Sequence, residues 1–122
     1  YDMIVLPGGM PGADHLRRDP RVVALLQRFA PSGRYTAAIC AAPGVLAQAG
    51  LLDGRAATSY PGFLTPDSAP GIRLREDAVV IDGKVVTSRG PGTAVPFALS
   101  LIELLAGAPA RRAVQERLQL PS

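Results

Sequence analysis

The sequence predicts a single α/β domain, residues 1–122, built around a mostly parallel sheet. Its 122 residues are 48% hydrophobic and 19% charged, a balance typical of one globular domain. Short segments such as 1–6 and 35–39 are predominantly apolar, as strands covered on both faces are. Segments with helical periodicity separate these apolar runs, and this alternation indicates a parallel sheet with helices on both faces.

The first strand and the first helix are marked by their ends. The run Tyr1–Leu6 stops at Pro7-Gly8-Gly9, which predicts a buried strand followed by a tight turn. Asp19 before Pro20 is a typical helix N-cap with proline in the first turn, and apolar residues continue at helical spacing to Phe29. We therefore expect a helix from Pro20 to about Phe29.

The middle of the chain predicts a strand, a sharp turn and a short helix. The apolar run Tyr35–Ile39 leads through Cys40 into a helix that starts at Pro43. Residues 56–60 predict a further strand, and the proline-rich segment 61–71 predicts an irregular loop. Cys40 is thus expected at a turn from strand to helix.

The last third of the chain predicts a hairpin and two helices. In the segment 79–88, Asp82-Gly83 separates two apolar runs and is expected to supply both positive-φ residues of a tight turn. Thr93 caps the next helix, which ends at Gly107, and its apolar residues lie nearly all round. We expect that helix to be buried on more than one side, and residues 109–118 to form a more polar one.

Composition excludes several functional classes. The net charge is +3, and the arginines are scattered rather than gathered into the basic stripe of a nucleic-acid-binding protein. The single cysteine, Cys40, excludes an internal disulfide and a multi-cysteine zinc site. No segment has the roughly 20 uninterrupted apolar residues of a membrane span, and no secretory signal is evident. We expect a cytoplasmic protein whose main partner is neither a membrane nor a nucleic acid.

Three loops that follow predicted strands, 7–12, 40–43 and 89–93, carry the candidate chemistry. In open α/β sheets, ligands bind at the carboxyl ends of strands, where backbone N–H groups at helix starts converge. Cys40 in such a loop would lie near the positive end of a helix dipole, which favours the nucleophilic thiolate. The alternative is that Cys40 is a small buried core residue and that the glycines only form turns.

Three motifs occur at characteristic separations: LPGG at 6–9, AAICAAP at 37–43 and TSRGPGT at 87–93. Together they resemble the DJ-1/ThiJ/PfpI superfamily, in its DJ-1 and bacterial YajL-like branch, and the likeness extends from Tyr1 to about Leu118. The resemblance implies a flavodoxin-like three-layer sandwich. It also implies that the first strands and the first helix are missing, so that this chain forms the C-terminal two-thirds of the family domain.

The resemblance further implies roles for individual residues. Cys40 would be the nucleophile and redox-sensitive thiol on a nucleophile elbow. Backbone N–H groups of Gly9 and Ala41 match an oxyanion pocket, and Pro91 matches a residue that reaches towards the partner's cysteine in a homodimer. The implied pocket residues are Gly8, Gly9, Ala41, Tyr60 and Pro91. Neither a metal nor an organic cofactor is implied.

The activities that the resemblance implies are glyoxalase and deglycase activities. The first converts methylglyoxal to lactate without glutathione, and the second removes early glyoxal adducts. The alternative is a non-catalytic redox sensor or stress chaperone whose cysteine is oxidised to a sulfinate.

Two departures from the family pattern affect this interpretation. The family carries a glutamate, hydrogen-bonded to the cysteine, on the helix after its first strand, whereas the first glutamate here is Glu76. We therefore expect a further N-terminal segment in the parent protein, and little or no activity from this chain alone. Tyr60 and Ala41 stand where other branches have histidine, so a cysteine–histidine protease dyad is not expected.

Overall fold

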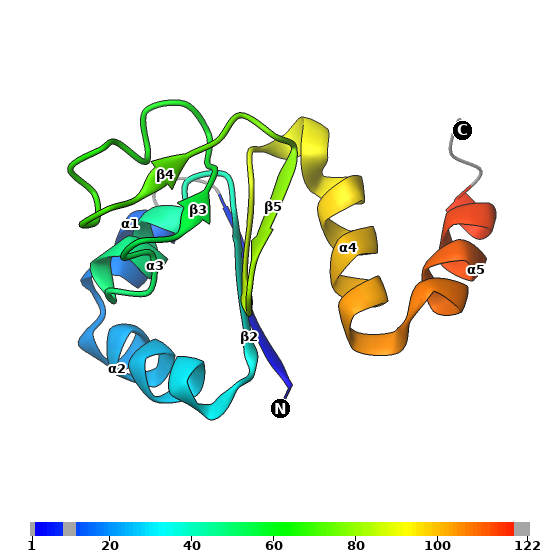
Figure 1. Ribbon diagram of the computed structural model, residues 1–122, viewed down its shortest axis with the longest axis horizontal. Coiled ribbons are helices and arrows are strands. Elements are labelled where there is room, and N and C mark those ends of the chain that lie inside the picture. Colours follow the sequence, from blue (N-terminus) through cyan, green and yellow to red (C-terminus); the bar gives the residue numbers. More distant parts are fainter. Residues whose placement is uncertain (1, 9–11, 119–122) are drawn as a thin grey trace.

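A four-stranded sheet separates two groups of helices in the computed structural model, which describes residues 2–8 and 12–118 (Figure 1). In spatial order its strands are β1 (Met3–Leu6), β2 (Tyr35–Ile39), β6 (Val85–Ser88) and β5 (Val79–Asp82). β1 pairs with β2 and β2 pairs with β6 in parallel, whereas β5 and β6 form an antiparallel hairpin. The mostly parallel sheet confirms the predicted fold class.

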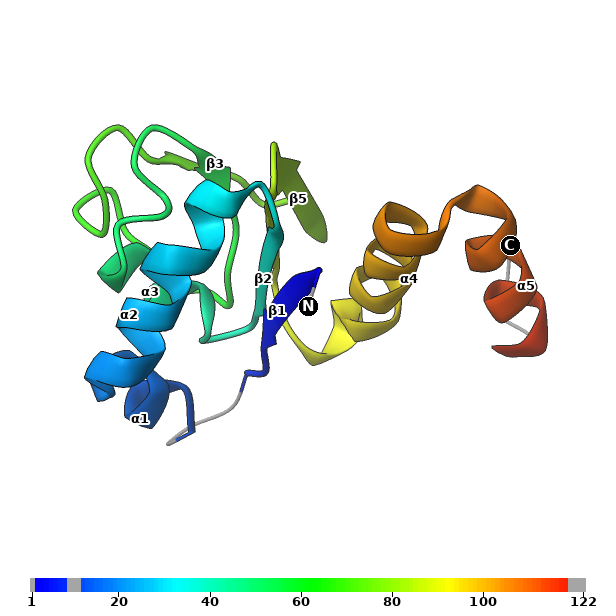
Figure 2. The same cartoon turned by 90° about the horizontal axis from the view of Figure 1, so that it is seen from below.

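Helices cover both faces of this sheet. On one face lie α1 (Gly12–Arg18), α2 (Pro20–Phe29) and α3 (Pro43–Gln48). On the other lies α4 (Ala94–Ala106), and α5 (Ala108–Leu118) packs against α4 on the side away from the sheet (Figure 2). The short remaining elements are η1 (Ala30–Ser32), η2 (Pro91–Thr93), β3 (Ala56–Ala57) and β4 (Arg73–Leu74). No helix in the described part of the chain is long and apolar enough to cross a bilayer.

The start of α2 confirms the predicted N-cap. The Asp19 carboxylate accepts a hydrogen bond of 2.9 Å from the Arg21 backbone N–H, and Pro20 occupies the first turn, where no N–H partner is needed. The helix ends at Phe29, as predicted, and passes into η1. Leu26 and Phe29 are buried on the side of α2 that faces the core.

The hairpin forms as predicted, but its turn was misplaced by one residue. Asp82 pairs with Val85 at the end of the ladder, so the two-residue loop is Gly83-Lys84. Only Gly83 of this loop takes a positive φ, 61°, which fits a turn that needs glycine at its first central position. Asp82 stays in the strand, where its carboxylate accepts a 2.8 Å hydrogen bond from the Ala56 N–H.

The strand predicted at 56–60 is shorter than expected. Only Ala56–Ala57 forms a ladder, which pairs in parallel with β4. The residues that follow are bound by the main sheet instead, because the Thr58 N–H donates to Thr87 Oγ1 at 3.0 Å and the Tyr60 N–H donates to the Cys40 carbonyl at 2.8 Å. This segment therefore lies beside the end of β2.

Helix α4 packs on two sides, as expected, but part of its apolar surface stays exposed. Phe97, Leu99 and Ser100 are buried, but Val95 is 41% exposed and Leu105 is 51% exposed. The helix touches the sheet on one side and α5 on another, and no described residue covers its remaining apolar surface. The sequence has apolar residues on all sides of this helix, but it does not show which segments of the chain pack against them.

The prediction that the Thr93 side chain caps α4 is wrong. The Thr93 hydroxyl makes no capping bond to α4. It accepts from the Gly90 N–H at 3.0 Å and lies 2.7 Å from the Ser88 hydroxyl. Thr93 therefore closes the turn ahead of the helix, since that turn competes for the same oxygen. Gly107 ends α4 at φ 91°, as predicted.

Candidate active site

Cys40 occupies a sharp corner immediately after β2. It is the only non-glycine residue with a positive φ in the described ranges, at 67°. A residue with a side chain is strained in this backbone conformation, and it persists only where the surrounding structure holds it. Here the Cys40 N–H donates to the Ser88 carbonyl at 3.0 Å, and the Cys40 carbonyl accepts from the Tyr60 N–H at 2.8 Å. Neighbouring segments on both sides thus fix the corner.

Gly8 brings the end of β1 against this cysteine. A Cβ atom at Gly8 would lie 2.4 Å from Cys40 Cβ, 2.8 Å from the Ile39 carbonyl oxygen and 3.4 Å from Cys40 Sγ. The first two distances are too short for any side chain, so only glycine permits this approach. The glycine predicted to be a pocket residue therefore contacts the cysteine directly.

The turn between Cys40 and α3 contains one of the two predicted oxyanion donors. Ala42 donates its N–H back to the Ile39 carbonyl at 3.1 Å, whereas the Ala41 N–H is used by no hydrogen bond among the described residues. The Ala41 side chain is buried, and its packing fixes the position of the Ala41 backbone. Gly9, the other predicted donor, lies outside the described residues.

Tyr60 and Pro91 lie on the β6 side of the corner. The Tyr60 ring rests on Gly90, where an added Cβ would come within 3.2 Å of Tyr60 Cδ2. Pro91 follows as the first residue of η2 and is exposed. The described parts of the three strand-end loops thus meet at one edge of the sheet, where Gly8 and Tyr60 contact Cys40 and Gly90 contacts Tyr60.

Sequence reasoning missed one aromatic residue beside this site, Phe63. Tyr60-Pro61-Gly62-Phe63 forms a turn in which the Phe63 N–H donates to the Tyr60 carbonyl at 3.1 Å and Gly62 takes φ 93°. The two rings meet edge to face, with centroids 6.2 Å apart. The signal was present, because proline and glycine at the central positions are typical of a type II turn, which places its two end residues together.

Cys40 is not a core residue. It is a free thiol of intermediate burial and belongs to neither cluster of buried apolar residues. The alternative of a buried structural cysteine is therefore not supported by its surroundings. Among the described residues, no three histidine, cysteine or acidic side chains gather as metal ligands would.

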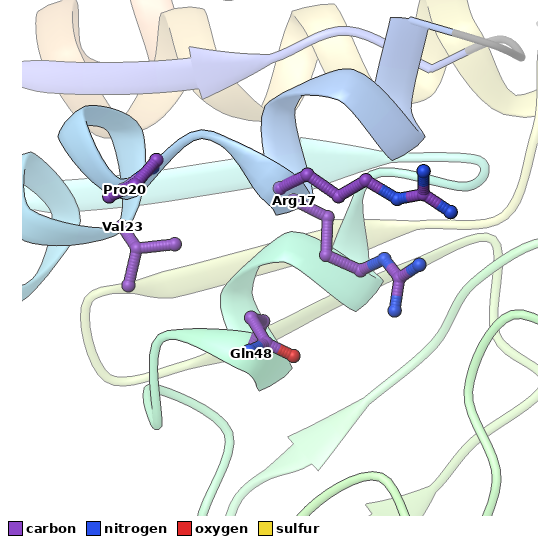
Figure 3. Close-up of a pocket in the computed structure, with 5 residues that line it drawn as sticks. Arg17, Pro20, Val23 and Gln48 are labelled. Atoms are coloured by element: carbon purple, nitrogen blue, oxygen red, sulfur yellow. The ribbon is translucent and has the colours of Figure 1, made fainter.

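A separate hollow of about 570 Å³ lies between α1, α2 and α3 (Figure 3). Its lining residues are Arg17, Arg18, Pro20, Val23 and Gln48. None of them is a predicted site residue. The candidate active site is therefore the corner at Cys40 and not this hollow.

Comparison with known proteins settles the family. The sequence pattern of the DJ-1/PfpI family matches residues 1–104. The chain belongs to the DJ-1/PfpI family. This confirms the resemblance on which the site residues were assigned.

Relatives and solved structures agree with this membership. The dj-1beta protein of Drosophila melanogaster is 44% identical over 108 residues, which are 88% of this chain and 57% of that protein. Its crystal structure matches with a TM-score of 0.90 and 39% identity, covering 100% of this chain and 66% of that one.

Two further relatives have functional names. The glutathione-independent glyoxalase DJR-1.2 of Caenorhabditis elegans is 39% identical over 107 residues, 88% of this chain and 56% of that protein. A deglycase of Pyrococcus abyssi is 34% identical over 105 residues, 86% of this chain and 63% of that protein. The chain thus spans little more than half the length of most of these relatives.

Proposed function

We propose that the protein is a cysteine-dependent glyoxalase or deglycase that acts on small α-oxoaldehydes or their early adducts. The observation that carries this proposal is the strained corner that holds Cys40, a residue of intermediate burial, against Gly8. Relatives named as a glyoxalase and a deglycase support the reaction class. Thiol addition to a carbonyl needs an accessible sulfur with a nearby hydrogen-bond donor for the developing oxyanion.

In the proposed reaction, the Cys40 thiolate adds to the aldehyde carbon of methylglyoxal. A carbon–sulfur bond forms, and the carbonyl electrons move to the oxygen, which accepts a hydrogen bond from the Ala41 N–H. The hydrogen on the aldehyde carbon then leaves as a proton and returns to the neighbouring carbon through an enediol. The aldehyde carbon is thereby oxidised to a thioester while the ketone carbon is reduced to an alcohol.

Water completes the cycle by hydrolysing the thioester, which releases lactate and restores the Cys40 thiol. One water is consumed, and no external oxidant or reductant is needed because the oxidation and the reduction occur within one molecule. The proton transfer needs a base near the sulfur. The resemblance assigns this base to a glutamate for which the present chain has no counterpart, since its first glutamate is Glu76.

The test uses protein expressed from the complete reading frame that contains this chain. Lactate formation from methylglyoxal should fall on the order of 10³-fold or more in Cys40→Ser, because the attacking sulfur is lost. Leu25→Ala is the control, since Leu25 is exposed on α2 and belongs to no part of the site. Equal rates for wild type and Cys40→Ser would remove Cys40 from the mechanism and end the proposal.

The partial exposure of Cys40 also supports a second candidate function, a redox sensor. A partly exposed cysteine reacts with peroxide and advances to a sulfinate when neighbouring N–H groups stabilise the oxidised form. Intact-protein mass spectrometry after graded peroxide treatment distinguishes the two. A sensor gains two oxygens on Cys40 at low dose and shows negligible turnover, whereas an enzyme turns over substrate and loses activity as the sulfur is oxidised.

We also propose a second copy of the chain as the partner, as the family resemblance implies. Pro91 is exposed at the rim of the Cys40 corner, where a neighbouring subunit could contact it. Sedimentation velocity over a range of concentrations tests this. A single monomeric species at all concentrations would contradict it.

A further inference from the structure

The loop beside Cys40 presents two aromatic rings to solvent. Tyr60 is 49% exposed and Phe63 is 38% exposed, although the residue that follows them, Leu64, is buried. Exposed aromatic rings contribute little to folding, and their gathering in a pair is unusual in a chain with only six tyrosine and phenylalanine residues. The pair therefore calls for an explanation in terms of what it contacts.

The geometry of the pair is fixed by the backbone. Pro61 and Gly62 form the centre of a closed turn, so the Cα atoms of Tyr60 and Phe63 are held together by the 3.1 Å bond across it. The rings contact each other at a centroid distance of 6.2 Å and an interplanar angle of 62°. A preorganised aromatic surface binds a ligand without the loss of side-chain freedom that a mobile one incurs.

This surface is also tied to the cysteine. The Tyr60 N–H donates to the Cys40 carbonyl, and the Tyr60 ring rests on Gly90, two residues after the Ser88 carbonyl that accepts from the Cys40 N–H. The aromatic pair and the thiol thus share one backbone framework. The backbone of Tyr60 therefore lies beside that of Cys40, and Phe63 follows across the same turn.

The loop is uncharged from residue 56 to residue 66. The rings therefore offer an apolar face rather than a site for a charged group. A methyl group covers little of such a face, whereas a phenyl ring can pack against it in the offset or edge-to-face arrangements that aromatic groups prefer. The rings of Tyr60 and Phe63 therefore favour a ligand with a planar aromatic substituent.

We propose that Tyr60 and Phe63 form a specificity surface that favours α-oxoaldehydes whose ketone carries an aromatic ring over methylglyoxal. This inference rests on the proposed function for its substrate class. Phe63 acts by packing against the substituent and takes no part in the bonds made and broken at Cys40. An aromatic contact of this kind is worth about threefold to tenfold in selectivity.

The first test needs no turnover. Iodoacetamide and iodoacetanilide both alkylate Cys40, because the thiolate displaces iodide and forms a carbon–sulfur bond, and the reagents differ only in a phenyl group. The ratio of the two rates, divided by the same ratio for glutathione, measures the preference of the site for the phenyl group. We expect a ratio above about three in the wild type and a fall to about one in Phe63→Ala.

Matched variants separate aromatic packing from other effects. Phe63→Leu keeps apolar bulk and should recover only part of the preference, whereas Leu25→Ala removes a side chain of similar exposure on α2 and should leave the ratio unchanged. A wild-type ratio of one, or an unchanged ratio in Phe63→Ala, would overturn the proposal. Circular dichroism confirms that each variant is folded.

The second test uses the complete protein with phenylglyoxal and methylglyoxal. The quotient of the two kcat/KM values should fall about threefold to tenfold in Phe63→Ala. No turnover of either aldehyde, together with a phenyl preference in alkylation, would contradict the proposed function and leave the specificity surface standing. Turnover of both with a quotient unaffected by Phe63→Ala would overturn the specificity surface alone.

Discussion

The two faces of the sheet are built differently. The face under α1, α2 and α3 carries the larger apolar cluster, whose buried residues come from the strands, from α2, from α3 and from the segments that follow α3. The face under α4 has only three buried members in its cluster, Ala37, Val86 and Phe97. On this second face Val5 is 45% exposed and Leu105 on α4 is 51% exposed. The difference shows that the first face supplies most of the stability of this chain.

The helices on the two faces also begin differently. The first turn of α2 is capped by Asp19, which also holds the Arg21 guanidinium through two hydrogen bonds. The first turn of α4 has no side-chain cap, because the hydroxyl of Thr93 is used within the preceding turn. The first face is thus better defined by local interactions as well as by burial.

The largest expected effect comes from the centre of the first face. Leu46 on α3 is fully buried within the larger cluster, so Leu46→Ala removes apolar contacts and leaves a cavity. We expect a loss of about 2–5 kcal/mol in the free energy of unfolding. Urea denaturation followed by circular dichroism measures it, and a loss below about 1 kcal/mol would contradict the assignment of the main core.

Two buried threonines on neighbouring strands give the next effect. Thr87 on β6 accepts a hydrogen bond from the buried Thr58 N–H, whereas the Thr36 hydroxyl on β2 has no partner among the described residues. Thr87→Val should therefore destabilise by about 1–3 kcal/mol because a buried N–H is left unsatisfied. Thr36→Val removes a group that makes no bond and should be neutral or stabilising. Equal losses in the two variants would show that the hydrogen bond contributes nothing.

A smaller effect is expected at the cap of α2. Hydrogen bonds from the Arg21 side chain, and then from its backbone N–H, lower the pKa of Asp19 below its ordinary value of 3.8. Because the folded-state pKa is the lower one, the charged cap stabilises the fold above the ordinary value and this contribution is lost as pH falls through the lowered value.

The Asp19 effect is measured against Asp19→Asn, which keeps a capping oxygen but does not titrate. The advantage of the wild type in urea midpoint should be present at about pH 5 and shrink towards about pH 2. An advantage that is constant across this range would contradict the role of the carboxylate charge.

The smallest effect is expected on the second face. Leu105 is half exposed on α4, so Leu105→Ala should change the free energy of unfolding of this chain by less than about 0.5 kcal/mol. The same substitution in protein from the complete reading frame tests whether this surface is covered there. A loss above about 1.5 kcal/mol in this chain alone would remove the contrast between the faces.

Local signals predicted most of the fold. Asp19-Pro20 fixed the start of α2, and the apolar run before Cys40 located β2 and the corner after it. The exposed part of α4 could not be predicted in this way, because an apolar sequence shows which side chains favour burial and not which neighbours cover them. The hairpin turn was misplaced because Asp82 has a tertiary partner, the Ala56 N–H, that no local pattern reveals.

The candidate site shows the same limits. Its loops were predicted because the carboxyl ends of parallel strands share one edge of a sheet. Contacts between those loops depend on distances that spacing along the chain does not give, such as the approach of Gly8 to Cys40. The Tyr60–Phe63 pair lay within reach of turn rules, but only the structure placed it beside the cysteine. The catalytic roles of these residues stay predictions.

The contact between Gly8 and Cys40 has a kinetic consequence. The corner needs β1, β2 and β6 in register, and these strands come from distant parts of the chain, so their pairing is intrinsically slow. Until these strands have paired, the Cys40 sulfur reacts with an alkylating reagent as a cysteine in a flexible peptide does. The rate at which Cys40 is alkylated during refolding therefore reports when the sheet has assembled.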